Sequence, residues 1–409
     1  MMTTARADAL PAYALFAAML ASAGLPIYIH APKFFVDSYG VSLASLGAVL
    51  FGLRLLDVVQ DPAFGWLADK TRSRRALTVL VAVAVLALSM FGLFAVTPPV
   101  APLLWFALCL TGLFSAFSFL TICFYAQGVT KAETMQGGHF RLAAWRETGG
   151  LLGVCVAAAT PTLLLGFTSP FALFSAGFGV LCVLAYLSMR RQWIVGEVQG
   201  ETGFREVLRD ATARRLLLIA LVNAAPVAVS STLFLFFVES RLLAPGWEGP
   251  LLLLFFLAAA ASAPVWGKLA QRYGAKPVLL SAMVLAIIAF GYAAALGPGD
   301  TTAFAIICIA TGAAMGADLT LLPAIFARRM AVIAPNAAQA FGLWSFVSKF
   351  TLAFAAVTLL PLLQASGFSS GAMNPVEALT MLSVLYALVP CVLKLIAIGL
   401  LAATQIPES

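Results

Sequence analysis

Long apolar stretches separated by short polar segments run through almost the whole chain. Many of them exceed the roughly 20 residues that a helix needs to cross a bilayer. We expect twelve membrane helices and a polar segment between the sixth and the seventh. The expected ranges are 10–35, 41–64, 76–97, 101–127, 140–166, 170–189, 215–240, 249–270, 277–297, 301–327, 338–365 and 375–402. A closed β-barrel would instead show short alternating segments, so the predicted fold class is an all-α membrane protein.

Composition agrees with this interpretation. The chain is 62% hydrophobic and 10% charged, with a mean hydropathy of +1.01. The first apolar stretch has no separate cleavage site, so we expect it to remain as the first helix. All six cysteines lie in apolar stretches and form no CxxC or Cys/His pattern, which predicts neither disulfides nor a structural metal.

Lysine and arginine lie mostly on one side of the expected topology, which fixes its orientation. The basic residues on that side are Arg6, Lys70, Arg72, Arg74, Arg75, Lys131, Arg141, Arg190, Arg191, Arg205, Arg209, Arg214, Arg215, Lys268, Arg272, Lys276, Arg328 and Arg329. We therefore expect both termini in the cytoplasm. The net charge of +7 is explained by this asymmetry, so we expect no nucleic-acid partner.

Three charged residues interrupt the second apolar stretch. Arg54, Asp57 and Asp61 are spaced by three, four and seven, which puts them on one helical stripe. Charges are costly in lipid, so this stripe should face protein or water. It predicts a cation or proton site; the alternative is an Arg–Asp pair that only locks two helices together.

A similar loop follows the second and the eighth expected helices. It reads GWLADKTRSRR at 65–75 and GKLAQRYGAK at 267–276. Such a repeat predicts a duplicated transporter with two six-helix bundles, 1–189 and 215–409, joined by a cytoplasmic loop at 190–214. Glycine allows close helix approach, and an aspartate can pair with nearby arginines to hold the cytoplasmic side closed. The predicted gating residues are Arg54, Gly65, Asp69, Arg72, Arg74, Arg75, Gly267 and Arg272; alternatively the basic residues are only a positive-inside anchor.

The loop at 65–75 fits the signature of the major facilitator superfamily. The longer stretch from Arg54 to Arg74 resembles the glycoside–pentoside–hexuronide:cation symporters, the melibiose permease-like family. The resemblance implies the major facilitator fold and a site for Na⁺, Li⁺ or H⁺ at Asp57 and Asp61. It also implies contributions from an amide at Gln60 and a hydroxyl at Ser118, with Thr121 one turn further along.

The expected topology supports that grouping independently. The second and fourth helices both run inward, which puts Asp57, Asp61, Ser118 and Thr121 at a similar depth. Hard cations prefer several oxygen ligands, which these side chains supply. One of two neighbouring carboxylates can instead hold a proton, because like charges raise each other's pKa. The choice between Na⁺ and H⁺ stays open.

For the substrate, the resemblance implies contacts from Tyr125, Arg146 and Lys349. The family's helix-1 Lys–Asp pair, which holds a galactoside, falls here on Leu20 and Ala21, and its helix-4 aspartate falls on Thr121, so a galactoside is not expected.

Basic and aromatic residues take their place. Tyr28, His30 and Lys33 lie on the first helix and Asp318 on the tenth. With Arg146 and Lys349, they favour an anionic substrate.

Structural alternatives exist for each of these charged residues. Lys33 can snorkel to the interface, and His30 can be an ordinary hydrogen-bonded interior residue. Arg146 can pair with Glu147 or with Asp57. Asp318 can relay a proton, although we favour an ion pair with Lys349 or Lys394; Lys394 can alternatively snorkel to the cytoplasmic face.

These patterns predict an inner-membrane secondary transporter working by alternating access. It would couple Na⁺ or H⁺ to symport of a small sugar-like or organic-acid solute that can be anionic. We expect no cofactor besides the coupling ion, a monomer in the bilayer, and no enzyme activity, since nucleotide-binding and nucleophile motifs are missing. Alternatives are a lipid or lysolipid carrier of the same fold, and a membrane receptor or assembly factor that does not transport.

Overall fold

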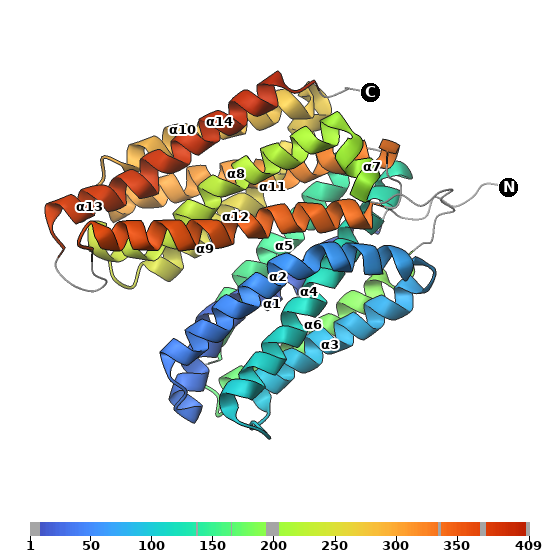
Figure 1. The fold of residues 1–409 in the computed structure, drawn as a ribbon, viewed down its shortest axis with the longest axis horizontal. Coiled ribbons are helices and arrows are strands. Elements are labelled where there is room, and N and C mark those ends of the chain that lie inside the picture. The colour runs from blue at the N-terminus through green and yellow to red at the C-terminus, as the bar shows by residue number, and fades with distance from the viewer. Residues whose placement is uncertain are drawn as a thin grey trace. The chain divides into compact units, whose positions relative to one another are not determined.

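The computed structural model describes residues 9–135, 138–164, 166–193, 204–333, 337–368 and 374–405. Over these ranges the chain is helical and contains no strand. Contacts group it into two units, Met1–Phe204 with Met330–Ser345, and Arg205–Arg329 with Phe346–Ser409 (Figure 1). The segment 330–345, which we expected in the second bundle, thus groups with the first.

Six long helices form most of the first unit. They are α1 (Leu10–Tyr39), α2 (Leu43–Lys70), α3 (Arg75–Ala95), α4 (Pro102–Glu133), α5 (Gly138–Leu163) and α6 (Pro170–Met189). The side chain of Ser42 accepts a hydrogen bond from Ser45 N at 3.1 Å and so caps α2. Proline occupies the first turn of α4 and α6, where its missing N–H costs nothing.

Small residues bring α1 and α5 into close contact. A Cβ at Gly149 would lie 2.2 Å from Ala14 O, and one at Gly153 would lie 2.4 Å from Ala18 O. Only glycine permits such an approach, because any side chain would overlap the backbone of α1. In the same unit α2 packs on α4, and α3 packs on α4 and α6.

The second unit repeats this arrangement. Its helices are α7 (Phe204–Arg209, at the boundary), α8 (Ala211–Phe236), α9 (Glu248–Tyr273), α10 (Ala275–Ala293), α11 (Thr301–Ile333), α12 (Ala338–Ala365, shared with the first unit), α13 (Val376–Ser383) and α14 (Val389–Ala403). Short π-helical turns follow α8 and join α13 to α14. Contacts of α14 with α8 and α10 correspond to those of α6 with α1 and α3, as expected for a duplicated bundle.

Eight helices among the described residues are long and apolar enough to cross a membrane. The remaining expected spans, α1, α2, α5 and α12, have 26 to 30 residues and are also long enough. Several helices run past their predicted ends, for example α2 to Lys70 and α4 to Glu133. Hydropathy marks the apolar part of a helix, whereas backbone hydrogen bonding continues into its polar ends.

Candidate functional site

Asp57 and Asp61 lie one turn apart on α2, and the fold buries both. Their exposed fractions are 4% and 0%. The proline at 62 interrupts the hydrogen-bonding pattern of α2 one residue after Asp61, and the helix nevertheless continues. Two carboxylates inside one helical bundle form a concentrated source of negative charge.

Neutral hydrogen-bond donors surround Asp57. Ser118 Oγ on α4 donates to Asp57 Oδ1 at 3.0 Å, and Gln60 Nε2 donates to the same oxygen at 3.2 Å. Ser115 Oγ donates in turn to Gln60 Oε1 at 3.0 Å and fixes the amide. The structure therefore brings together three residues that the sequence predicted for a cation site, and adds Ser115, which we missed.

Thr121 lies on α4 one turn after Ser118. Its Oγ1 is buried and has no hydrogen-bond partner among the described residues, although a helical threonine can bond its own backbone. A buried hydroxyl left open in this way suits a ligand. The side chain of Arg54, which we placed on the same stripe as the aspartates, lies outside the described residues.

Arg146, Glu147 and Tyr125 form a second polar cluster in the same unit. Arg146 Nε donates to Glu147 Oε1 at 2.7 Å, and Tyr125 Oη donates to that oxygen at 3.1 Å. The Arg146 guanidinium lies 3.7 Å from the centre of the Tyr125 ring. Of the two pairings considered for Arg146, the structure shows the one with Glu147, so its charge is largely compensated within the cluster.

Open donors remain beside this pair. Arg146 Nη2 and the Tyr13 hydroxyl are both buried, with no hydrogen-bond partner in the described parts of the chain. Tyr13, on α1, interacts electrostatically with Arg146, and Phe341 packs on Tyr125 with ring centres 5.3 Å apart. The cluster therefore offers donors to a polar ligand next to aromatic surface. The pairing of Glu147 with Arg146 was one of the two considered from the sequence, whereas the roles of Tyr13 and Phe341 depend on contacts between distant segments, which no local sequence pattern reveals.

The first turns of α12 pack against α2 directly beyond Asp61. A Cβ at Gly342 would lie 2.9 Å from Asp61 O, and one at Gly65 would lie 3.0 Å from Ala338 O. The close approach that we predicted for Gly65 is therefore present, and its partner is Gly342.

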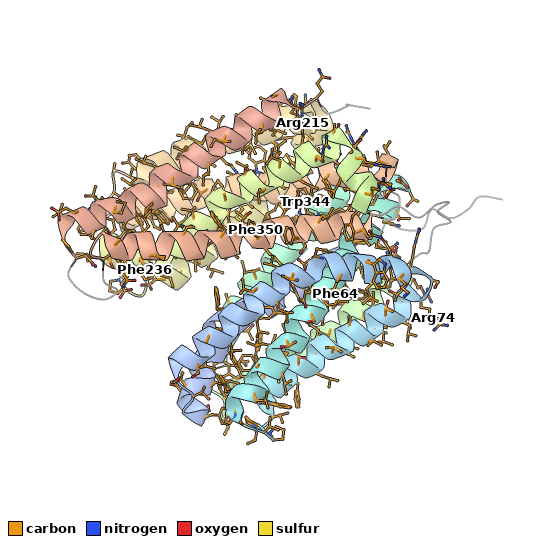
Figure 2. The ribbon with its side chains drawn as sticks, viewed as in Figure 1. Phe64, Arg74, Arg215, Phe236, Trp344 and Phe350 are labelled. Atoms are coloured by element: carbon orange, nitrogen blue, oxygen red, sulfur yellow. The ribbon has the colours of Figure 1, made fainter. Side chains whose placement is uncertain are left out.

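The predicted gating charges lie at the end of α2. Arg75 is buried, donates to Ala68 O at 3.0 Å and interacts electrostatically with Asp69. Asp69 also interacts with Arg72 and with Gln339, whose Oε1 accepts a hydrogen bond from Phe204 N. Arg74 is exposed at the turn that follows α2 (Figure 2).

The first helix contributes His30 to an aromatic cluster. Its ring lies 5.7 Å from that of Phe171, which stacks on Phe94. The side chains of Tyr28 and Lys33, predicted to contact substrate, lie outside the described residues.

The other predicted residues belong to the second unit. Asp318 forms an ion pair with Lys394, which is 4% exposed; Lys394 therefore does not snorkel. Lys349 is half-buried on α12, where Figure 2 labels Trp344 and Phe350. Gly267 is buried in α9, and the exposed Arg272 stacks on Tyr273.

The donor set around Asp57 suits a hard monovalent ion better than a transition metal. It contains carboxylate, amide and hydroxyl oxygens and no imidazole or thiolate. The described residues include no group of three or more His, Cys, Asp or Glu side chains that could hold a metal.

Comparison with known proteins decides the family. The sequence model of the MFS/sugar transport protein family matches residues 11–408. The chain belongs to this family. Membership makes it a multi-pass membrane transporter of the major facilitator superfamily for a small-molecule substrate, and not an enzyme.

Individual relatives are distant. The inner membrane symporter YicJ of Escherichia coli (strain K12) is 25% identical over 238 residues, which are 52% of this chain and 50% of YicJ. The match thus spans half the length of that relative. Crystal structures of a bacterial homologue of the iron transporter ferroportin in an outward-facing state, without and with soaked iron, give TM-scores of 0.68 and 0.67 at 14% and 13% identity. They cover 95% and 96% of this chain and 99% of their own, and they confirm the predicted major facilitator fold.

Proposed function

We propose that this transporter is a symporter that couples a cation, Na⁺, Li⁺ or H⁺, to the movement of a small sugar-like or organic-acid solute across the inner membrane, with both termini in the cytoplasm. One observation carries the proposal: two buried carboxylates, Asp57 and Asp61, lie one turn apart, and the Gln60 amide and the Ser118 hydroxyl contact Asp57. Similarity to the YicJ symporter supports it.

A bound cation would offset the charge of these carboxylates inside the bundle. Carboxylate, amide and hydroxyl oxygens together suit Na⁺ or Li⁺. A proton can replace the metal ion on one carboxylate, because two neighbouring negative charges favour protonation of one of them. Competition between Na⁺ and H⁺ for one site follows from this chemistry.

The solute would bind at the cluster of Tyr125, Arg146 and Glu147. This cluster combines open donors, Arg146 Nη2 and the Tyr13 hydroxyl, with a carboxylate and aromatic rings. Donors and an acceptor side by side suit hydroxyl groups as well as a carboxylate. Because Glu147 compensates Arg146, a neutral hydroxylated solute fits here as well as an anion.

Coupling would pass through the close contact of α2 with the first turns of α12. The carbonyl of Asp61 faces Gly342 in that contact, and Asp69 and Gln339 interact one to two turns further along. A cation at Asp61 would bias α2 toward one packing of this crossing. Binding energy at one site can shift a conformational equilibrium in this way when the two states bind the ion differently.

A thermal-shift screen tests the proposal on purified protein. The panel contains neutral sugars, uronates and other organic acids, each with Na⁺, Li⁺ or K⁺ at acidic and neutral pH. A ligand that binds the folded state raises the unfolding midpoint by mass action. We expect stabilisation by one solute class that increases with Na⁺, Li⁺ or protons, and loss of this ion effect in Asp57→Asn and Asp61→Asn.

Two results would reject the proposal. One is solute stabilisation with the same ion dependence in both variants as in the wild type. The other is stabilisation by lipids alone, with no ion effect, which would instead indicate a lipid carrier. Size-exclusion profiles in detergent check that both variants are folded and monodisperse.

A further inference from the structure

The second unit contains a buried polar cluster that the cation site does not use. Lys394 Nζ on α14 donates to Asn223 Oδ1 on α8 at 2.7 Å and to Asp318 Oδ2 on α11. Side-chain exposure is 4% for Lys394 and 10% for Asp318. Three helices of one bundle therefore meet at a charge-neutral ion pair in an apolar interior.

One carboxylate oxygen of this cluster is open. Asp318 Oδ1 is buried and has no hydrogen-bond partner within the described ranges. Asp318 and Lys394 line a cavity of about 40 Å³ together with Ser230 and Thr311. Both hydroxyls donate to carbonyls of their own helices, Ser230 to Val227 O and Thr311 to Ile307 O. The oxygen lone pairs of the two hydroxyls therefore face the cavity, and its polar end is rich in hydrogen-bond acceptors.

An apolar lobe adjoins this polar end. Its volume is about 110 Å³, and its walls include Phe234, Phe255, Phe290, Phe304 and Tyr386. Ser230 and Thr311 line both lobes, which are therefore neighbours. An apolar protein cavity of roughly 150 Å³ admits a benzene ring, so the two adjoining lobes together are of a size that suits one small ring with a polar substituent.

We propose that the two lobes form a binding site for a small uncharged molecule that carries a hydroxyl group on a single-ring body. The hydroxyl would donate to Asp318 Oδ1, and its oxygen can accept the third N–H of Lys394, since only two are used by Asn223 and Asp318. The ring would pack among the phenylalanines.

The charges of Asp318 and Lys394 disfavour ligands of similar shape that carry a different group in place of the hydroxyl. A carboxylate has no hydrogen to donate and would face Asp318. An ammonium has no acceptor and would add a second positive charge beside Lys394. A hydrocarbon would leave Asp318 Oδ1 open, whereas burial of an unsatisfied polar group is unfavourable. A hydroxyl keeps the cluster neutral, and it can donate to Asp318 while it accepts from Lys394. This site is independent of the Asp57 cation site and does not depend on the proposed symport.

Four probes built on one phenyl ring, which differ in the attached group, test the proposal: benzyl alcohol, toluene, benzoate and benzylammonium. Binding is measured by saturation-transfer NMR on the full-length protein in detergent, with empty micelles as reference. We expect benzyl alcohol to bind at least about fivefold more tightly than toluene, and the two ions more weakly than either. Equal binding of all four probes, or none above micelle background, would overturn the proposal.

Two variants on α8 locate the site. Ser230→Leu fills the junction of the lobes and should weaken benzyl alcohol at least about tenfold. Thr232→Leu is the matched control, because Thr232, like Ser230, donates to a carbonyl of its own helix, at Ala228 O, and lines neither lobe. An unchanged affinity in Ser230→Leu would contradict the site.

A double variant tests the polar end even if Ser230→Leu fails to fold. Asp318→Asn combined with Lys394→Met removes both charges at nearly constant volume. We expect the ratio of the affinities for benzyl alcohol and toluene to fall to about one, while both probes still bind. A preserved preference would show that the ion pair does not bind the hydroxyl.

Discussion

At the scale of single residues, Asp57 is the centre of the first polar cluster. One of its oxygens accepts from a hydroxyl on α4 and from an amide one turn along its own helix. Hydrogen bonds from neutral groups stabilise a carboxylate without cancelling its charge. These two donors fix the geometry of the Asp57 carboxylate.

Removing the Ser118 hydroxyl should weaken cation binding. Ser118→Ala deletes a hydrogen bond to a carboxylate, typically worth about 1.5–3 kcal/mol, so the apparent cation affinity should fall roughly tenfold or more. Ser175→Ala is the control, since Ser175 is buried on α6 and bonds only Ala172 O of its own helix. Equal ion dependence of the thermal midpoint in both variants would argue against Ser118 as part of the site.

Arg146 should be needed for solute binding rather than for the ion. Arg146→Lys keeps a positive charge but loses the planar group that bonds Glu147 and stacks on Tyr125. We expect solute affinity to fall at least about tenfold, with cation binding changed by less than about threefold. A matched loss of both affinities, measured by titration of solute and ion, would show that Arg146 serves the structure of the bundle.

The family resemblance put Gln60 and Ser118 beside Asp57, and the expected topology put Ser118 at a similar depth. The structure has all three in contact, and their role in cation binding stays a prediction. Glu147 was named only as a possible partner of Arg146, and Tyr13 was missed. Its hydroxyl lies in the site because α1 packs closely on α5, and this packing is not encoded in any local pattern.

At the scale of elements, glycines at the helix crossings determine how closely two helices approach. Gly65 on α2 and Gly342 on α12 face one another next to Asp61. The sequence indicated the glycine at 65 but not its partner, because Gly342 follows nearly 280 positions later in the chain.

Alanine at Gly342 should disturb this crossing. Its Cβ would lie 2.9 Å from Asp61 O and 3.3 Å from Gly65 Cα, and such overpacking typically costs about 1–3 kcal/mol. Gly52→Ala on α2 is the control: nothing lies within 4 Å of its Cβ, so alanine there should raise helix stability by about 1 kcal/mol. Thermal midpoints that rise equally in both variants would contradict the close crossing.

A second element-scale device fixes the start of α8. Asp210 Oδ1 accepts from Ala213 N at 2.7 Å, which caps the helix, and Arg329 Nε on α11 donates to the same oxygen at 3.0 Å. Hydrogen bonding to Arg329 lowers the pKa of Asp210. We expected a loop over 190–214, whereas α8 already begins at Ala211 and Asp210 separates it from α7.

The two roles of Asp210 can be separated. Asp210→Asn keeps a capping oxygen and loses the ion pair, costing about 0.5–1 kcal/mol, whereas Asp210→Ala also loses the cap, for about 1–2 kcal/mol in total. Because the folded pKa is lowered, the ion-pair contribution is present above the ordinary aspartate pKa and is lost as pH falls through the folded value. Denaturation of both variants at neutral and acidic pH measures their free energies of unfolding. We expect Asp210→Ala to be less stable than Asp210→Asn at neutral pH, and equal stability there would contradict the two roles.

At the scale of the whole molecule, two bundles with corresponding helix contacts support a duplicated transporter fold. Hydropathy and the repeated loop predicted this architecture and nearly every helix. The length of each apolar stretch and the positions of the charged residues can be read directly from the sequence. The ion pair of Asp318 with Lys394 is one of the two that the sequence favoured. The contacts of α12 with α2 and the hydrogen bond from Lys394 to Asn223 on α8 could not be predicted from the sequence. Such contacts depend on tertiary packing between segments far apart in the chain.

The most direct test of the account is calorimetric titration of purified protein with Na⁺ and Li⁺ in K⁺ buffers. Buffers of different ionisation enthalpy report any protons exchanged. We expect saturable cation binding with proton release at acidic pH, lost in Asp57→Asn and Asp61→Asn and kept in Asp37→Asn, a change at an exposed position on α1. Binding that is unchanged in the first two variants, or a wild type that binds neither Na⁺ nor Li⁺ and exchanges no proton, would contradict a cation site at Asp57 and Asp61.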